Sequence, residues 1–253
     1  MKISVITVAR NNADTIADTM QSVAKQTHPD VEHIIVDGAS TDGTIEVVKH
    51  QGRRVAKILS EPDQGMYDAL NKGIAMATGE IIGLLHADDA YAEDSVLAQV
   101  AQVMQDVSVD ACYADLIYVD RKKTSRIVRY WKSKPYEEGL FEKGWMPAHP
   151  TLFVRRRVYE RCGGFDTSLK IAADFELTMR LLRIYRIRSV YVPKIWIKMR
   201  TGGISNRRLI DIIRSNLEAR RACRKHALRV SPLFILTKVL SRAPQFFARP
   251  PGM

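Results

Sequence analysis

Residues 80–89 read EIIGLLHADD, and this stretch decides how the chain is organised. The apolar run over 81–85 has the length and the branched side chains of a buried strand. It is followed by His86 and then by two adjacent aspartates, Asp88 and Asp89. Adjacent carboxylates are common on surfaces. At the end of a buried strand, however, they suit a hard divalent cation and leave room for phosphate oxygens as further ligands.

Strands and helices alternate on both sides of this stretch within the first 120 residues. Apolar, β-branched runs predict further strands, and segments with apolar residues at helical spacing separate them. The predicted strands cover 2–9, 31–40, 54–63 and 109–120, and the predicted helices cover 12–26, 41–51, 65–79 and 92–106. This order predicts parallel β-α-β units and an α/β fold, with a doubly wound, mostly parallel sheet flanked by helices.

The pattern changes in the second half of the chain. We expect an edge strand, another strand, a helix, two short strands and a long cationic helix, in that order over 124–134, 147–156, 171–185, 188–193, 196–201 and 206–229. Pro232 breaks the last helix, and an apolar segment follows it. We therefore divide the chain into a domain over 1–203, with halves 1–120 and 121–203, and a basic helical C-terminal region over 204–253.

Charge is distributed unevenly along the chain, whose net charge is +11. Residues 1–120 hold 8 Lys and Arg against 19 Asp and Glu, whereas residues 121–253 hold 31 against 9. A basic half indicates either a polyanionic partner (anionic lipid, a phosphorylated substrate or nucleic acid) or a solvated basic surface. The three cysteines are far apart in the sequence and predict a reducing compartment. The first residues lack the pattern of a secretory signal, and no apolar run reaches the roughly 18 residues of a membrane-spanning helix.

Polar side chains follow the first four predicted strands, and ligands bind beyond the carboxyl ends of the strands in doubly wound sheets. Arg10 follows the first strand, Asp37 the second, the segment 61–65 the third and the segment 86–89 the fourth. A lone acid at such a place can instead cap a helix, as at Asp42. Polar groups at all four ends favour one shared site over four separate caps.

Two neighbouring segments add to this predicted site. After Asp37, the small residues 38–40 allow a ligand to approach the backbone closely. The helix predicted over 65–79 begins near the same edge, where its amides and dipole favour an anion. Asp68 and Asn71 fit the first turn of that helix equally well, and this is the interpretation we prefer for Asp68.

Six motifs stand in the order and at the spacing found in one enzyme family. They are ITVARNN, VDGASTDGT, SEPDQGMYDALNKGIAMATGE, LLHADD, PAHPTLFVRRRVYERCGGFD and IAADFELTMRLL. Over residues 2–200 the chain resembles the family 2 glycosyltransferases, and it is similar to the bacterial branch that builds exopolysaccharide, capsule or O-antigen repeats. The resemblance implies a GT-A fold and a nucleotide-diphosphate sugar donor, UDP being the common choice. It also implies Mn²⁺ or Mg²⁺ as cofactor and transfer of a hexosyl or N-acetylhexosaminyl group with inversion at the anomeric carbon.

The resemblance also assigns roles to individual residues. It implies nucleotide contacts for Thr7, Val8, Arg10, Asp37, Asp63, Gly65 and Asp88. Among these, Asp37 would contact the base, and Asp88 would lie near the ribose and the diphosphate. Asp89 would ligate the metal. Asp174 matches the aspartate that acts as general base and takes the proton of the acceptor hydroxyl.

Two positions depart from the family pattern. Many relatives have Asn where this chain has His86, and Glu directly before the base where this chain has Ala173. Asp174 also fits a helix cap, and both histidines named next also fit structural roles. Further acceptor or diphosphate contacts are expected at His86, His149, Arg200 and Ser205. The last two border a glycine-containing loop that we expect to be mobile and to close over the diphosphate.

The C-terminal region combines a cationic helix with a short apolar segment rich in aromatic residues. This combination predicts a surface anchor on an anionic membrane, with packing on the core or a dimer interface as the alternative. Together with the resemblance, it predicts a peripheral protein at the cytoplasmic face of the plasma membrane. The expected acceptor is a polyprenyl-diphosphate-linked molecule or a saccharide, no nucleic acid is expected as partner, and the oligomeric state is left open.

Other functions fit the sequence less well. A nicotinamide-dependent oxidoreductase needs a G-x-G-x-x-G turn after the first strand, where this chain reads ARNNAD. A nucleotidyltransferase would begin with a glycine-rich loop that ends in Arg or Lys. A nucleic-acid-binding protein would carry zinc-finger spacing or an RNA-recognition motif, and neither is present in the sequence. A non-catalytic protein that binds nucleotide sugars is the remaining alternative.

Overall fold

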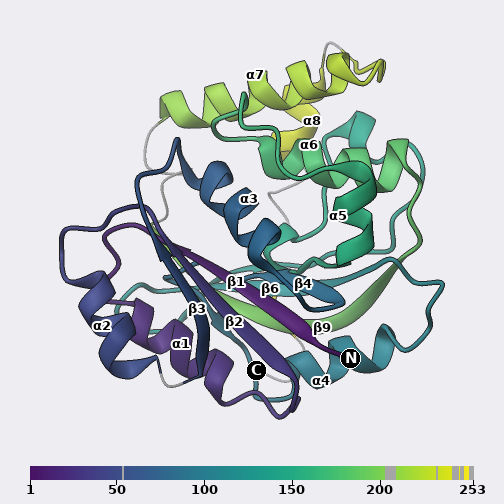
Figure 1. Ribbon diagram of the computed structural model, residues 1–253. Helices are drawn as coiled ribbons and strands as arrows, with labels where there is room; N and C mark the ends of the chain where they lie inside the picture. Colours follow the sequence, from purple (N-terminus) through teal and green to yellow (C-terminus); the bar gives the residue numbers. More distant parts are fainter. Residues whose placement is uncertain (53, 203–208, 232, 241–244, 246–247, 251–253) are drawn as a thin grey trace.

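The computed structural model describes residues 1–52, 54–202, 209–231, 233–240, 245 and 248–250. These residues form a nine-stranded sheet with helices on both faces (Figure 1). The strands are β1 (Ile3–Ala9), β2 (Val31–Asp37), β3 (Val55–Ser60), β4 (Ile81–Leu84), β5 (Ala90–Tyr91), β6 (Ala111–Val119), β7 (Ile127–Trp131), β8 (Phe153–Arg155) and β9 (Ser189–Arg200). The predicted α/β architecture is confirmed.

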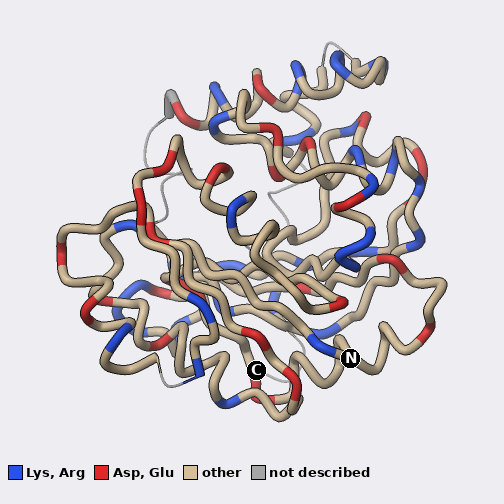
Figure 2. Tube along the Cα trace, viewed as in Figure 1, with Lys and Arg blue, Asp and Glu red and all other residues tan. Residues whose placement is uncertain are grey.

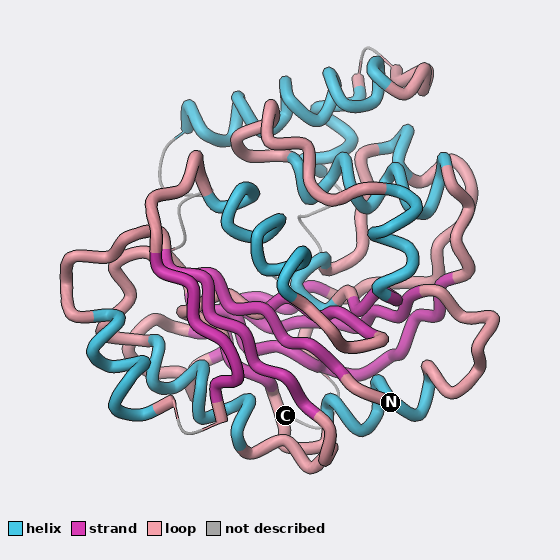
Figure 3. Tube along the Cα trace, in the orientation of Figure 1, coloured by secondary structure: helices cyan, strands magenta, loops and turns pink. Residues whose placement is uncertain are grey.

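Helices connect and cover these strands (Figure 3). They are α1 (Ile16–Ala24), α2 (Thr44–Gln51), α3 (Met66–Met76), α4 (Val96–Val103), α5 (Arg156–Cys162), α6 (Ala173–Met179), α7 (Leu209–Lys225) and α8 (Phe234–Leu240). Two 3₁₀ turns, η1 (Phe141–Lys143) and η2 (His149–Thr151), and a π-helical segment, η3 (Arg180–Ile184), complete the described elements. Helices α1, α2 and α4 lie on one face of the sheet, and α3, α5 and α6 lie on the other (Figure 1).

The first four long strands form the parallel half of the sheet. β1 pairs in parallel with β2 and β4, and β2 pairs in parallel with β3. Every residue of β1 is buried, as expected for a strand that is covered on both faces. Because these strands run in the same direction, their carboxyl ends meet at one edge of the sheet, as the sequence predicts.

The rest of the sheet is mixed. β8 lies between β4 and β6 and is antiparallel to both, so β6 runs in the same direction as β4 without contacting it. β6 pairs in parallel with β9 and antiparallel with β7. The alternation of strands and helices predicts the direction of β6 correctly. It does not reveal the inserted strand, because β8 comes from a segment much later in the chain.

Two details of the second half differ from the prediction. The two short strands expected over 188–193 and 196–201 are one strand, β9. In the described sheet, β9 pairs with β6 on one side and with β5 at Ile197 and Lys198 on the other, so Pro193 interrupts no ladder on the β5 side. The strand expected over 147–156 begins as the turn η2 and is followed directly by α5, which the sequence did not predict.

Helices α7 and α8 form an outer layer over α6 (Figure 1). Phe234 of α8 is fully buried, and its ring lies 6.2 Å from the ring of Phe175 in α6. The ammonium of Lys238 lies 5.0 Å from the centre of the same ring. The inner side of α8 therefore packs on the domain, as the packing alternative predicted. The predicted break at Pro232 and the boundary between 203 and 204 lie outside the described residues.

Candidate active site

Asp37 organises the loop that follows β2. Its side chain is fully buried. Oδ2 accepts hydrogen bonds from the Ser40 N–H (3.0 Å) and the Ser60 hydroxyl (2.7 Å), and Oδ1 accepts one from the Ser40 hydroxyl. These bonds offset the cost of burying a carboxylate. The expected contact of Asp37 with a nucleotide base stays a prediction, because the carboxylate is engaged with its own loop here.

Asp63 fills the space above Gly38. A Cβ atom at Gly38 would lie 2.2 Å from Asp63 Oδ2, so a larger residue would displace the carboxylate. Asp63 Oδ1 accepts a hydrogen bond from the Gly65 N–H (2.9 Å) and lies 4.0 Å from Arg10 Nη1. The prediction that Gly38 leaves room for a ligand is therefore corrected, since Asp63 occupies that room. The Arg10 side chain is 67% exposed at the mouth of the site.

Thr7 and Val8 of β1 are buried in the interior of the fold and are 0% and 8% exposed. Thr7 Oγ1 lies 3.0 Å from His33 Nε2. Burial lowers the pKa of His33 to about 4, which keeps this imidazole neutral near pH 7. Of the three residues expected to line the nucleoside from β1, Arg10 is the one whose side chain reaches solvent.

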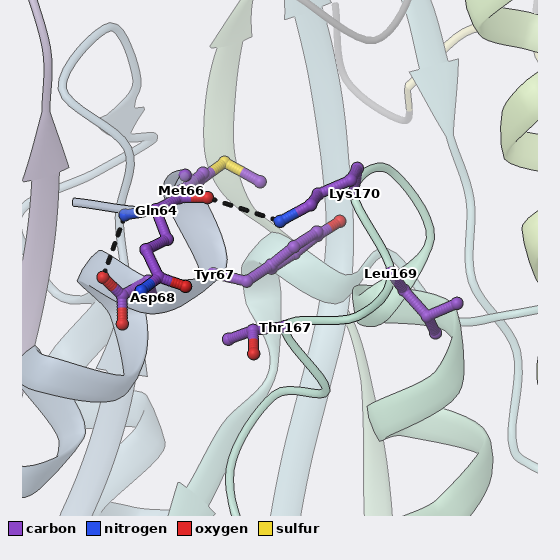
Figure 4. A pocket seen from close by; sticks show the side chains of 8 residues that line it. Gln64, Met66, Tyr67, Asp68, Thr167, Leu169 and Lys170 are labelled. Carbon is purple, nitrogen blue, oxygen red and sulfur yellow. Dashed lines mark hydrogen bonds between the residues drawn. The ribbon is translucent and has the colours of Figure 1, made fainter.

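A small pocket lies between the start of α3 and the loop over 167–170 (Figure 4). It is lined by Gln64, Gly65, Met66, Tyr67, Asp68, Thr167, Leu169 and Lys170. The Gln64 N–H donates to Asp68 Oδ2 (3.0 Å), and Lys170 Nζ donates to the Gln64 carbonyl across the pocket (3.5 Å). Asp68 therefore supports the first turn of α3, as we preferred. Binding of an anion at this helix start stays a prediction.

His86 lies within electrostatic reach of two carboxylates from different halves of the chain. Burial lowers the pKa of His86, and the negative charges of Asp88 and Asp174 counteract this effect. Asp88 is half-buried, and no hydrogen bond or ion pair holds its carboxylate among the described residues. The end of β4 and the start of α6 therefore meet at one place, as the motif order predicts.

Asp89, the next residue, is buried in the interior. Its side chain is 1% exposed, and Oδ1 accepts a hydrogen bond from the Arg200 N–H (3.2 Å). Oδ2 is buried without a hydrogen-bond partner among the described residues. Burial, followed by the charge of Asp88, raises the pKa of Asp89 well above its usual range. The Asp89 carboxylate therefore joins the end of β4 to β9 through Oδ1, while Oδ2 is buried, and its expected contact with a metal stays a prediction.

Arg200 is also part of the interior. It is 8% exposed, Nη1 donates to the Asp88 carbonyl (3.0 Å), and Nη2 forms an ion pair with Asp18 of α1. The expected contact of Arg200 with a diphosphate stays a prediction, because its guanidinium group is buried and engaged with protein oxygens here. The prediction for Ser205 lies outside the described residues.

A carboxylate–imidazole pair joins α6 to η2. His149 Nε2 lies 3.1 Å from Asp174 Oδ2, and the two side chains are 25% and 21% exposed. Asp174 Oδ1 accepts a hydrogen bond from the Phe175 N–H (2.7 Å), and the edge of the Trp131 ring packs near His149. A carboxylate that is oriented and still partly exposed is suited to accept a proton from a bound hydroxyl. The sequence proposed both residues but did not pair them.

Tyr67 reaches the same place and was missed by the sequence reasoning. Its hydroxyl donates to the Ile171 carbonyl (2.7 Å) and lies 3.5 Å from Asp174 Oδ1. Its ring stacks on Phe165, with the ring centres 5.3 Å apart. The helical spacing of its segment predicts a buried tyrosine. The spacing does not predict which group the Tyr67 hydroxyl contacts, because Ile171 lies far away in the sequence.

The described residues hold no group of three or more His, Cys, Asp or Glu side chains that could coordinate a metal. A cation at this edge would therefore have few protein ligands and would take phosphate oxygens for the rest, as the sequence suggested. The Asp88 carboxylate offers oxygens that no hydrogen bond or ion pair engages in the described part of the chain. These oxygens fit Mn²⁺ or Mg²⁺.

Comparisons with known proteins indicate the family to which the sequence is similar. The family model described as glycosyl transferase family 2 matches residues 4–163. A PGL/p-HBAD biosynthesis glycosyltransferase of Mycobacterium bovis is 29% identical over 208 residues, which cover 80% of this chain and 78% of the relative. An uncharacterized glycosyltransferase of Mycobacterium tuberculosis is 31% identical over 180 residues, which cover 70% of this chain and 68% of the relative.

Solved structures share the fold. The structure of S. aureus TarS 1–349 in complex with UDP-GlcNAc superposes with a TM-score of 0.65 at 19% identity, covering 88% of this chain and 69% of that one. The mannosyltransferase PcManGT of Pyrobaculum calidifontis, in complex with GDP-Man and Mn²⁺, has a TM-score of 0.65 at 23% identity and covers 95% of this chain and 69% of that one. At these identities the likeness establishes the fold alone.

Proposed function

The chain belongs to glycosyl transferase family 2 and is a nucleotide-sugar-dependent glycosyltransferase; from this premise we propose that it transfers a sugar, with inversion, to a hydroxyl of a lipid-linked or saccharide acceptor in bacterial surface polysaccharide synthesis. The observation that carries the proposal is the pairing of Asp174 with His149 beside His86 and Asp88. A proton acceptor thus lies next to the strand edge where nucleotides bind in such sheets.

Asp174 is the proposed general base. The acceptor oxygen attacks the anomeric carbon from the face opposite the diphosphate, the bond from that carbon to the diphosphate oxygen breaks, and Asp174 takes the hydroxyl proton. His149 holds Asp174 Oδ2 from one side, and the Phe175 N–H holds Oδ1 from the other. This arrangement fixes the direction of the carboxylate before the acceptor arrives, which lowers the cost of orienting it.

Asp88, in place of Asp89, is the proposed metal ligand. No hydrogen bond or ion pair holds its carboxylate among the described residues, whereas the Asp89 carboxylate is buried against β9. A divalent cation bound here would neutralise the charge that develops on the departing diphosphate. Arg200 supports the assignment indirectly, because its bond to the Asp88 carbonyl fixes the backbone from which the Asp88 side chain extends.

The proposed donor is a UDP-sugar, and the proposed group is a hexose or an N-acetylhexosamine. Support comes from the shared fold, since TarS binds UDP-GlcNAc and PcManGT binds GDP-Man with Mn²⁺. Three of the proposed nucleotide contacts lie together at the mouth of the site, where the Arg10 side chain is exposed to solvent. They are Arg10, Asp63 and Gly65. Asp37 is proposed to contact the base after local rearrangement of its loop.

The proposed acceptor is presented at the cytoplasmic face of a membrane by a polyprenyl diphosphate. α7 and α8 expose apolar side chains, which are Ile212, Ile213, Leu217, Leu233, Leu236, Val239 and Leu240. Exposed Arg and Lys recur along α7 (Figure 2). Apolar side chains beside basic ones suit the surface of an anionic bilayer. No described helix is long and apolar enough to cross a membrane, so the proposal is a peripheral contact.

A panel of nucleotide sugars tests the donor proposal. We expect one UDP-sugar to raise the melting temperature in the presence of Mn²⁺, and the same compound to be turned over when lipid-linked acceptors are supplied. The matching free nucleotide is the control for binding without a sugar. Thermal stability that is indifferent to every nucleotide sugar, with and without Mn²⁺, would overturn the proposal.

Vesicle sedimentation tests the membrane contact. The double variant Leu236→Ser, Leu240→Ser removes two exposed apolar side chains and leaves the buried Phe234 and Lys238 in place. We expect it to bind phosphatidylcholine vesicles containing phosphatidylglycerol about tenfold more weakly than the unmodified chain. Val107→Ser, at an apolar position 73% exposed on another surface, is the matched control. Equal sedimentation of all three proteins would rule out this contact.

A further inference from the structure

Glu218, on the outer helix α7, contacts the segment that leads into α6. Its Oε2 accepts hydrogen bonds from the N–H groups of Ile171 (2.8 Å) and Ala172 (3.0 Å). Ala172 is the N-cap of α6 and has no side chain that could accept such bonds. A carboxylate from another helix therefore satisfies the amides at this helix start, and its charge is favourable near the N-terminal end of the helix.

The same short segment is held from the opposite side by α3. The Tyr67 hydroxyl donates to the Ile171 carbonyl, so Ile171 is bound through both its N–H and its C=O. Burial raises the pKa of Tyr67, and the negative charges of Asp174 and Glu218 raise it further. Both carboxylates, Glu218 and Asp174, are therefore within electrostatic reach of Tyr67.

α7 is itself anchored at its far end, so Glu218 has a fixed support. Lys225 Nζ forms an ion pair with Asp166 (2.7 Å). His226, just after α7, lies with its Nε2 2.6 Å from Oε1 of the buried Glu176 in α6. The partly exposed carboxylate of Glu218 thus projects from a helix that is tied to the same element at a second point.

We propose that Glu218 is a positioning residue for Asp174: it fixes the backbone at the start of α6 and so sets the direction in which the proposed base meets the acceptor hydroxyl. This inference rests on the proposed function. It makes α7 part of the catalytic arrangement as well as a carrier of basic side chains. A shift of a general base by even 1 Å costs roughly a hundredfold in rate, so a remote clamp of this kind has a measurable effect.

Steady-state kinetics of the full chain test the proposal, with the UDP-sugar selected by the thermal-shift panel as donor and a polyprenyl-diphosphate-linked saccharide as acceptor. We expect Glu218→Ala to lower kcat about tenfold to a hundredfold, with the KM for the donor unchanged, because the nucleotide edge does not involve α7. Glu218→Gln keeps an oxygen that can accept both N–H groups and should restore kcat to within about threefold of the unmodified chain. Rescue by Gln distinguishes a hydrogen-bonding role from a general effect of charge.

Asp211→Asn is the matched control, because it removes one negative charge from the first turn of α7, where no hydrogen bond or ion pair of Asp211 with α6 is described. Amide hydrogen exchange at residues 171–175 gives a readout that needs no turnover. Faster exchange in Glu218→Ala, together with the loss of kcat, supports the proposal. Unchanged exchange, or a kcat equal to that of Asp211→Asn, overturns it while leaving the proposed function intact. Absence of sugar transfer by the unmodified chain would overturn both.

Discussion

The parallel and mixed halves of the sheet contribute to the site in different ways. In the parallel half, the carboxylates of Asp37 and Asp63 lie at strand ends and are engaged by their own loops. In the mixed half, Asp174 and His149 lie on a short helix and a 3₁₀ turn, and they meet across the chain while remaining partly exposed. Asp37 and Asp63 form a hydrogen-bonded frame in the first half, and the second half carries the groups that stay available for proton transfer.

The difference follows from how each half satisfies its polar groups. Buried carboxylates are stable only when hydrogen bonds replace water, so the frame engages the oxygens of Asp37 fully. A general base must keep lone pairs for its substrate, and Asp174 therefore sits where the protein leaves it partly open. We therefore expect substitutions in the two halves to differ in whether they lower the catalytic rate or the stability of the fold.

The largest expected effect is at Asp174. Asp174→Asn keeps the size of the side chain and its contact with the Phe175 N–H, but it removes the proton acceptor. We expect kcat to fall about a thousandfold, within the range for loss of a general base. Calorimetric titration should give a UDP affinity within about twofold of the unmodified chain, because the frame is untouched. Activity that survives in this variant would place the base elsewhere.

The second effect separates two neighbours, Asp88 and Asp89. We expect Asp88→Asn to lower turnover about a hundredfold and to abolish the Mn²⁺ dependence of donor binding, because it removes the proposed ligand. Asp89→Asn keeps an oxygen for the Arg200 N–H and replaces a carboxylate whose pKa is already raised, so turnover should fall less than about tenfold.

Thermal shift with donor, measured with and without Mn²⁺, checks this pair. Each variant serves as the control for the other, since they make the same substitution one residue apart. The reverse result, in which Asp89→Asn loses the Mn²⁺ response and Asp88→Asn keeps it, would return the metal to Asp89. It would also show that the buried carboxylate turns outward when the cation binds.

These neighbours also mark how far the sequence could predict the site. The strand-end acids followed from the alternation of strands and helices, because parallel strands must end at one edge. The environment of each side chain did not follow, since Asp88 is half-buried whereas Asp89 is buried and accepts a hydrogen bond from the Arg200 N–H. Likewise, the burial of Arg200 depends on Asp18, which the chain brings in from α1. The sequence pattern locates the edge of the sheet. Contacts between segments that are distant in sequence decide which side chains at that edge remain exposed to solvent.

The same limit applies to the fold. The parallel half was predicted closely, because each strand is followed by its own helix and the pattern is local. The place of β8 between β4 and β6, and the contact of Glu218 with Ile171, join segments that are distant in sequence. No periodicity within one segment encodes such pairings.

The smallest effect on activity is expected at Glu32, which lies near the amino ends of the parallel strands. A substitution there tests whether this part of the sheet contributes to stability alone. Burial disfavours the Glu32 charge, but hydrogen bonds from Ser4, Thr78 and Lys57 outweigh burial and lower the pKa of Glu32 from 4.5 to about 2. The unfolded chain therefore binds a proton before the folded chain does as the pH falls. The stabilisation is fully present above about pH 4.5 and disappears as the pH approaches 2.

Glu32→Gln should accordingly lower the free energy of unfolding by about 3 kcal/mol at pH 7, the equivalent of that pKa shift, and by progressively less below pH 4.5. Urea denaturation at pH 7, 4 and 3 measures the difference, and Glu46→Gln, at an exposed position of α2, is the matched control. At neutral pH and low temperature, where both proteins are folded, kcat should be unchanged. A loss of kcat without a loss of stability would contradict this separation of roles. It would mean that Glu32, in the parallel half of the sheet, acts on the proton-transfer groups of the mixed half.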